Sequence, residues 1–370
     1  MYRMQRSVLT GLLAAVSIFD LTVAQACRPL PRLGGSRAPT TGVLRAAAIF
    51  VDFPDFAAQS STTDHWNTFT NASELFKTMS FGKLDLQMKP QLEKFYRMPG
   101  NSSSYNYKRG LTTEDHLRYV NDALKAVGTA VSFTGINVLY VVAAKGATEI
   151  SFSPTLMVTV TAADGTVIGN SVTYGQDAYN TWGYKVVNHE TGHTMGLPDL
   201  YPYSGGTTTQ WVGGFDMMGL ISGQSPDYFG ILKWQLGWVT NTQVDCVNTT
   251  GTSTHRISPI EVQGGTKKLV MVPLSSTQSV IAEVRSNQGA DKDACATGVL
   301  IYEARSDIAS GNGPIRVMDS KPGSAGCSPS IGGGLNDAPY QVGSTYSNGS
   351  GLSITVKSKE GEDYVVEVRR

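Results

Sequence analysis

The sequence carries little charge and no excess of either sign. Of its 370 residues, 16% are charged, and 30 basic side chains balance 30 acidic ones. A neutral chain has no electrostatic reason to bind nucleic acid or an anionic membrane surface. We therefore predict no nucleic-acid partner.

Long apolar runs are also scarce. Beyond residue 26, no run approaches the ~18 apolar residues that a membrane-spanning helix needs. Residues 1–26 combine two early arginines, a largely apolar stretch from Val8 to Phe19, and Ala-Gln-Ala at 24–26, the pattern of a secretory signal. An N-terminal membrane anchor is the alternative, but the run is too short and ends at Asp20. The sequence predicts a secreted, extracellular monomer without a membrane span.

The chain has few cysteines, and their number is even. The four cysteines are Cys27, Cys246, Cys295 and Cys327. In an exported chain an even count predicts two disulfides, with three possible pairings. Because three of them follow residue 240, we expect at least one bridge in the C-terminal half, with Cys27 tethering the N-terminus to it. The alternative is a free Cys27 thiolate that inhibits a metal centre.

Four sequons of the form N-x-S/T also fit export. If the source is eukaryotic, they predict glycosylated surface positions. The sequons begin at Asn71, Asn101, Asn248 and Asn348.

The stretch with the clearest chemistry runs from Val186 to Tyr201 and contains the pattern H-E-x-x-H. On a helix, His189 and His193 lie one above the other on the same face and can hold one zinc ion. Glu190, between them, can take a proton from a water on that zinc. Two histidines at this spacing can also be ordinary core or surface residues. The residues after His193 determine which interpretation is favoured.

Those residues predict a sharp turn after the helix. Gly196 favours a helix end, and Pro198 prevents continuation. The chain can then bring Asp199 to the metal as a third ligand, in the metzincin spacing H-E-x-x-H-x-x-G-x-x-D. No glutamate lies between Glu190 and Glu261, which disfavours the zinc proteases that take a downstream glutamate as third ligand. Asp199 as a plain turn residue is the alternative.

A second motif, G-G-F-D-M-M-G, spans Gly213 to Gly219. Metzincins carry a tight turn with a methionine beneath the metal, and Met218 is the candidate for it, with Met217 beside it in the core. Plain packing is the alternative for both methionines.

Together with K-W-Q-L-G-W at 233–238, these motifs resemble the immune inhibitor A family of secreted zinc metallopeptidases. Further resemblance lies in A-I-F-V-D-F-P-D at 48–55, S-F-G-K-L-D-L at 80–86, E-V-R at 283–285 and G-V-L-I-Y at 298–302. The resemblance implies a metzincin-like protease domain in which the strand before the zinc helix, within 156–174, lies at the sheet edge and pairs with extended peptide substrates. The chain departs from the family in leaving no room for its usual propeptide and further C-terminal modules.

Periodicity predicts an α+β protein. We expect a mixed sheet and an active-site helix, followed by an antiparallel β-sandwich from about residue 243. The expected strands and helices lie at 43–53, 64–79 (helix in part), 112–127 (helix), 138–144, 156–174 (two strands turning at Asp164-Gly165), about 180 onward (zinc helix), 268–272, 280–285, 299–303, 352–357 and 364–368. The expected segments are a signal peptide at 1–26, a short N-terminal segment at 27–42, a catalytic domain at 43–240 and a β-rich domain at 241–370.

The sequence thus predicts a zinc-dependent endopeptidase with Glu190 as the general base, which later passes its proton to the leaving amine. Tyr201 and Tyr228 are candidate oxyanion partners. Two alternatives are an inactive carbohydrate-binding or adhesive protein on a protease scaffold, and a metal-dependent amidase or deacylase acting on non-protein substrates. A structural calcium ion is left open.

Overall fold

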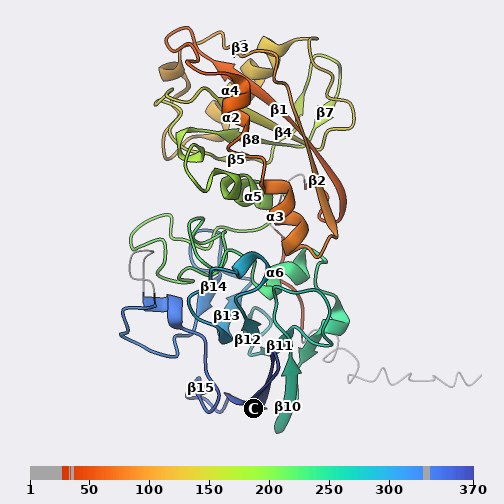
Figure 1. Ribbon diagram of the computed structural model, residues 1–370, viewed down its shortest axis with the longest axis vertical. Coiled ribbons are helices and arrows are strands. Elements are labelled where there is room, and N and C mark those ends of the chain that lie inside the picture. The colour runs from red at the N-terminus through yellow and green to blue at the C-terminus, as the bar shows by residue number, and fades with distance from the viewer. Residues whose placement is uncertain (1–26, 33, 35–36, 328–333) are drawn as a thin grey trace, which may run out of the picture.

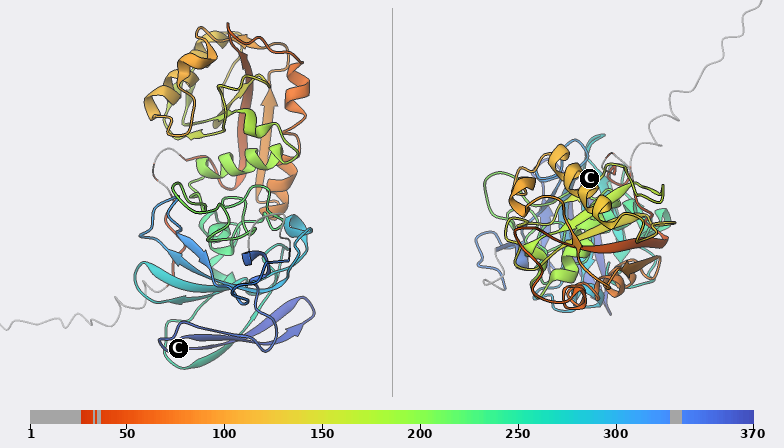
Figure 2. Two further views of the ribbon diagram at one scale, coloured as in Figure 1. Left: turned by 90° about the vertical axis from the view of Figure 1, so that its left-hand side faces the viewer. Right: turned by 90° about the horizontal axis from the view of Figure 1, so that it is seen from above.

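The computed structural model describes residues 27–32, 34, 37–327 and 334–370, so the predicted signal segment lies outside the described residues. The described chain is an α+β protein with few helices and several sheets, as the sequence predicts. Two halves are stacked end to end along the long axis (Figure 1), and a side view shows the same stacking (Figure 2). We call residues 42–194 the first half and residues 244–370 the second half.

The first half is built on a six-stranded sheet in which all neighbours but one pair are parallel. β4 and β8 are buried along their whole length because both faces of the sheet are covered, which explains the continuous apolar run of β4. β5 lies at the edge and pairs antiparallel with β8. In sheet order the strands are β2 (Leu84–Pro90), β1 (Gly42–Asp52), β4 (Val138–Ala143), β8 (Asn170–Tyr174) and β5 (Thr155–Leu156), with β3 (Tyr96–Arg97) beside β1.

Helices cover both faces of this sheet. α4 (Thr113–Val127) packs on one face, where Val120 and Leu124 join Ile49 and Val51 of β1 in one apolar cluster. α3 (Ala72–Met79) and α5 (Gly183–Thr194) pack on the other.

The ends of α4 follow the sequence prediction. Thr112 caps the helix by accepting a hydrogen bond from the Asp115 backbone N–H, and Gly128 follows its last residue. The helix expected to cover part of 64–79 is present as α3, and a second short helix, α2 (Thr62–Trp66), precedes it. α2 starts earlier because Ser61 and Asp64 form a capping box.

The second half consists of two sheets that share one apolar core. Val270, Val272 and Ile301 of one sheet pack with Ile354 and Val366 of the other. The expected strands are present, but the sandwich is not wholly antiparallel, because β9 pairs parallel with β11. One sheet has the order β14 (Ile315–Val317), β13 (Gly298–Arg305), β12 (Gln278–Arg285), β11 (Leu269–Pro273), β9 (Val244–Cys246), and the other β10 (Thr252–Ile257), β17 (Asp363–Arg369), β16 (Ser353–Glu360), β15 (Thr345–Ser347).

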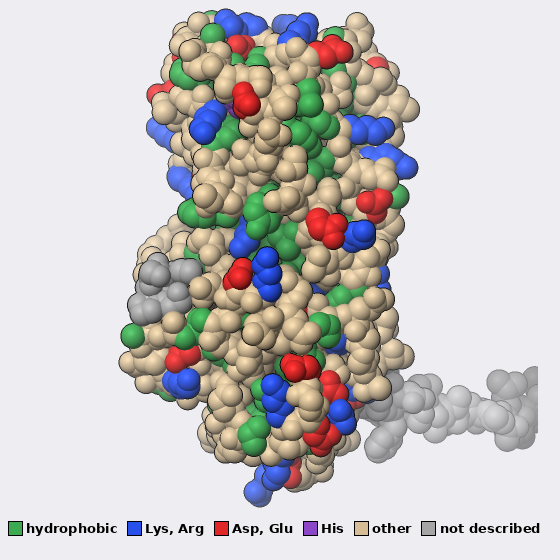
Figure 3. All heavy atoms as spheres, in the orientation of Figure 1, with side chains coloured by type: hydrophobic (Ala, Val, Ile, Leu, Met, Phe, Trp, Pro, Cys, Tyr) green, Lys and Arg blue, Asp and Glu red, His purple; other side chains and the backbone are tan. Residues whose placement is uncertain are grey.

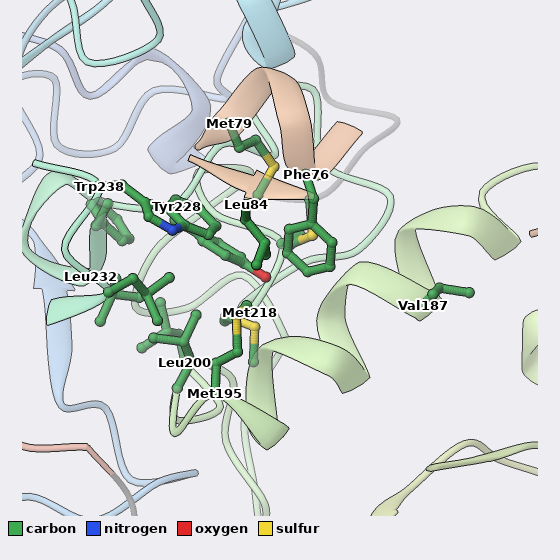
Figure 4. Packing of buried hydrophobic residues seen from close by; sticks show 14 of the residues in the cluster. Phe76, Met79, Leu84, Val187, Met195, Leu200, Met218, Tyr228, Leu232 and Trp238 are labelled. Atoms are coloured by element: carbon green, nitrogen blue, oxygen red, sulfur yellow. The ribbon is translucent and has the colours of Figure 1, made fainter. Parts of the chain in front are cut away.

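The connection between the halves, residues 195–243, includes α6 (Gly230–Gln235) and joins their cores. One buried cluster extends from Phe76 of α3 through Met218 and Leu232 to Leu269 and Tyr302. Figure 4 shows Met195 and Met218 beside the C-terminal part of α5, with Leu200 close to them. A continuous core therefore crosses residue 240, and the domain boundaries stay predictions.

Two disulfides join the cysteines, Cys27 to Cys246 and Cys295 to Cys327. The first confirms the expected tether of the N-terminus to the second half, and it leaves no free thiol at Cys27. The second lies within the second half, as expected. This arrangement fits an oxidising compartment.

The surface agrees with several sequence expectations. Of the sequon asparagines, Asn71, Asn101 and Asn248 are exposed, while Asn348 is half-buried and accepts a hydrogen bond from the Leu352 backbone N–H. Their glycosylation stays a prediction.

Basic and acidic side chains are scattered over the face in Figure 3. Over the described ranges, no helix is long and apolar enough to cross a membrane.

Candidate metal centre

The two motif histidines lie on α5, which is buried between the first sheet and the connection. The helix starts at Gly183, three residues later than the expected Asn180. Trp182, expected within the helix on the face that carries Val186, His189 and His193, instead precedes the first helical residue and is 40% exposed. This correction leaves the rest of the expected face in place: Val186 and His189 are buried, and the side chain of His193 is 12% exposed.

The end of α5 is a Schellman turn. Gly196 has a φ of +94°, its N–H donates to the His193 carbonyl at 2.8 Å, and the Leu197 N–H donates to the Gly192 carbonyl at 3.1 Å. A positive φ disfavours any residue with a Cβ, so glycine is required here. The turn reverses the chain and brings Asp199 back to the helix, as the spacing predicts.

Three ligand-type atoms then lie at almost equal distances from one another. His189 Nε2 and His193 Nε2 are 3.2 Å apart, and Asp199 Oδ1 lies 3.1 Å from the first and 3.2 Å from the second. Tetrahedral zinc, with bonds of about 2.0–2.1 Å, needs ligand atoms about 3.3 Å apart. The observed triangle is slightly smaller than this ideal one, and its size fits a zinc ion.

The Nδ1 nitrogens of both rings already form hydrogen bonds to backbone carbonyls. His189 Nδ1 lies 2.8 Å from the Met217 carbonyl, and His193 Nδ1 lies 2.8 Å from the Leu197 carbonyl. Because carbonyls only accept, both Nδ1 atoms carry a proton, so Nε2 is the ring atom that each histidine directs toward the other and toward Asp199. Asp199 Oδ1 is buried and has no hydrogen-bond donor. Three such atoms facing one another require positive charge between them, which protons on the rings or a metal ion can supply.

The electrostatics agree with this requirement. Burial lowers the pKa of His193, but the Asp199 carboxylate outweighs burial and raises that pKa to about 9. Burial would raise the pKa of Asp199, yet the two histidines hold it well below its usual range. The site thus favours positive charge among its ligand atoms, and a metal ion bound there would supply that charge in place of protons.

Glu190 stands beside the triangle rather than in it. Its Oε1 lies 3.9 Å from His189 Nε2, and its Oε2 lies 2.8 Å from the hydroxyl of Thr155 on the edge strand β5. The Thr155 hydroxyl is also 2.8 Å from the Glu190 carbonyl oxygen. Burial raises the pKa of Glu190. A carboxylate that is oriented but not in the ligand triangle is suited to carry a proton.

A cavity of about 870 Å³ opens over these groups. Glu190, His193 and Asp199 line it, the segment 152–157 with β5 forms one wall, and residues 201–203 with Ser310 form another. The edge strand is β5, which begins at Thr155, whereas the strand directly before α5 is β8, which lies between β4 and β5. The expectation that the strand before the zinc helix forms the sheet edge is therefore wrong. The expected turn at Asp164-Gly165 is confirmed: it joins β6 (Val160–Thr161) and β7 (Val167–Ile168), which form an antiparallel pair separate from the large sheet.

The methionine turn supports α5. The Met217 carbonyl accepts from His189, and Met218 is buried. A Cβ added at Gly192 would lie 3.0 Å from the Met218 sulfur and 2.8 Å from the Tyr228 hydroxyl oxygen, so glycine permits this close approach. Met218 thus lies against α5 at Gly192, and its place beneath a metal ion stays a prediction.

Two other candidates have structural roles instead. Asp216, an acid that could replace Asp199 as a ligand, stabilises the methionine turn: its carboxylate accepts from the backbone N–H groups of Met218 and Phe229 at 2.8 and 2.7 Å. The hydroxyl of buried Tyr228 donates to the Asn188 carbonyl at 2.9 Å, so Tyr228 is not an oxyanion partner. Tyr201 lines the cavity, and its ring stacks on His189 with centroids 6.2 Å apart.

Sequence reasoning missed Thr155, Tyr203 and Ser310. The Tyr203 hydroxyl donates to Asp199 Oδ2 at 2.7 Å, and Ser310 Oγ accepts from the Asp199 backbone N–H at 2.9 Å. The nearness of Tyr203 to Asp199 in the sequence is a weak signal. Ser310 is 111 residues from Asp199, and no sequence pattern indicates that the two residues are in contact.

The chain matches no model of a known protein family, and no curated protein matches it. The resemblance to the immune inhibitor A family therefore rests on the motifs alone, and the function must be argued from the site.

Proposed function

We propose that this protein is a secreted zinc-dependent endopeptidase of the metzincin type. The triangle of His189 Nε2, His193 Nε2 and Asp199 Oδ1 carries the proposal, since its spacing, its donor types and its burial all fit one zinc ion. Two disulfides and an H-E-x-x-H helix in one chain support an extracellular hydrolase.

Zinc at this position supplies Lewis-acid chemistry, which polarises a carbonyl oxygen and makes a water molecule more acidic. The protein supplies the proton transfer. Glu190, oriented by Thr155, accepts the proton of the attacking water and delivers it to the leaving amine. Burial favours the protonated carboxyl between these two steps.

The substrate proposed for the cavity is an extended peptide. β5 is an edge strand that contributes Thr155 to the site and lines the cavity, so a peptide laid along it would pass beside Glu190. Main-chain pairing of this kind holds a peptide without dictating its sequence. This geometry favours an endopeptidase over an enzyme for small non-protein amides.

Replacing Glu190 by Ala tests the assignment of the general base. We expect zinc content to stay at that of the parent protein, because Glu190 is not in the ligand triangle, and casein cleavage to fall by about 10²–10⁴-fold. Zinc analysis and a casein assay on the same samples measure both. Exposed Glu362→Ala is the control and should change neither. Near-normal cleavage by Glu190→Ala would exclude Glu190 as the base.

A further inference from the structure

The hairpin between β13 and β14 reaches from the second half to the candidate metal centre. The Asp199 backbone N–H donates to Ser310 Oγ at 2.9 Å, and the Gly311 N–H donates to the Asp199 carbonyl at 3.1 Å. The Tyr203 N–H donates to the Gly311 carbonyl at 3.1 Å. The backbone on both sides of the third ligand is therefore bonded to this hairpin.

The same hairpin holds the Asp199 side chain through Tyr203. Asp199 Oδ2 accepts from the Tyr203 hydroxyl at 2.7 Å, and that hydroxyl lies 2.9 Å from Ser310 Oγ. A phenol has one proton, and the charged carboxylate is its strongest acceptor. Ser310 must then donate to the Tyr203 oxygen while it accepts from the Asp199 N–H. Every donor in this chain of three residues has one acceptor.

Gly311 fixes the position of the Tyr203 ring. A Cβ at Gly311 would lie 2.3 Å from ring carbons of Tyr203, and its φ is +74°. The ring thus rests directly on the glycine backbone, although Tyr203 is 62% exposed. Farther along, the Val317 N–H donates to the Trp211 carbonyl at 2.8 Å, so β14 also holds the segment after Tyr203.

We propose that the second half is part of the metal centre, with Ser310 and Tyr203 as positioning residues that aim Asp199 Oδ1 at His189 and His193. This proposal rests on the proposed metal site. Asp199 follows a glycine turn and a proline, in a loop without secondary structure of its own. Hydrogen bonds from outside that loop reduce the entropy that the carboxylate loses on binding a metal. Partners of this kind change metal affinity by about 10–100-fold.

The test is the zinc Kd of the full chain, measured by competition with a chelator of known affinity. Ser310→Ala and Tyr203→Phe should each weaken zinc binding by about tenfold or more. The double variant should be little worse than either single one, because both act through one hydrogen-bond chain. Ser310→Thr keeps the hydroxyl and should restore most of the affinity.

Two controls separate positioning from general damage. Ser306→Ala removes a hydroxyl from the same hairpin, where it faces the Thr277 carbonyl at 3.5 Å rather than Asp199. Tyr346→Phe removes a phenol hydroxyl from β15. Both should keep the parent Kd, and thermal unfolding of the metal-free proteins should be similar throughout. If Ser310→Ala does not fold, Tyr203→Phe decides the question, since it removes only one hydroxyl from a largely exposed residue.

The outcomes distinguish the two proposals. A parent protein that binds no zinc would overturn the proposed function and this inference with it. A parent that binds zinc, with unchanged Kd in Ser310→Ala and Tyr203→Phe, would overturn the positioning role and leave the metal site standing. Equal losses in the Ser306→Ala control would also overturn it.

Discussion

Asp199 determines whether the two motif histidines form a complete zinc site. Its Oδ1 faces both Nε2 atoms without a donor, while its Oδ2 is bonded to Tyr203. One oxygen is thus free for a metal and the other is held by the protein. A residue that merely capped a turn would have no reason to leave a buried oxygen without a donor.

Substitution at Asp199 separates these roles. Asp199→Ala leaves two histidines and should lower zinc affinity by orders of magnitude, and Asp199→Asn should lower it as well, because a neutral amide is a poor zinc ligand. Asp199→His should restore part of the binding. Zinc stoichiometry after dialysis measures all three. Undiminished zinc in Asp199→Ala would contradict the ligand assignment.

At the residue scale, the sequence predicts the residues of the motif but not the residues that hydrogen-bond to them. His189, Glu190, His193 and Asp199 follow from spacing on a helix and from one glycine turn, which are local properties. Thr155 and Ser310 reach the site from other strands and loops, and spacing along the chain contains no information about such contacts.

Among the elements, β12 is joined to the connection by a buried cation. Arg285 has no exposed surface and donates to Glu283 Oε1 and Asp291 Oδ2 at 2.8 Å each, and to the Asp227 carbonyl at 3.1 Å. These contacts hold the segment before α6 against the second half. The carboxylates need the guanidinium because water does not reach them.

Arg285→Met should therefore destabilise the fold by about 3–5 kcal/mol, since it leaves two buried carboxylates without their cation. Denaturant unfolding measures the change. Arg256→Met is the matched control, because Arg256 on β10 pairs with Glu360 and Asp363 at the surface and should contribute little. Equal stability of the Arg285→Met variant and the parent would contradict this account of the junction.

Element prediction succeeded where signals are local. α4 has its cap, its apolar face and its terminal glycine in sequence, and β4 has a continuous apolar run. It failed where tertiary contacts decide, as at Trp182, which was expected within the zinc helix but lies exposed just before it. The parallel pairing of β9 with β11 likewise joins segments that no local pattern relates.

On the scale of the whole molecule, three distant parts of the chain meet at the turn after α5. The N-terminal segment donates from Ala38 N–H to the Thr194 carbonyl, and Arg32 bonds the Gln235 carbonyl beside Gly196. The second half adds Ser310. The Cys27–Cys246 disulfide joins the N-terminal segment to the second half. The turn that presents Asp199 is therefore held by the complete fold, which the sequence alone does not indicate.

The central claim is that this fold holds one catalytic zinc ion, and the most direct measurement combines metal analysis with a protease assay. The purified mature protein should contain about one zinc per chain. It should cleave casein, lose that activity in 1,10-phenanthroline, and regain it when zinc is restored. Full casein cleavage in excess 1,10-phenanthroline, by a protein free of zinc, would contradict the account.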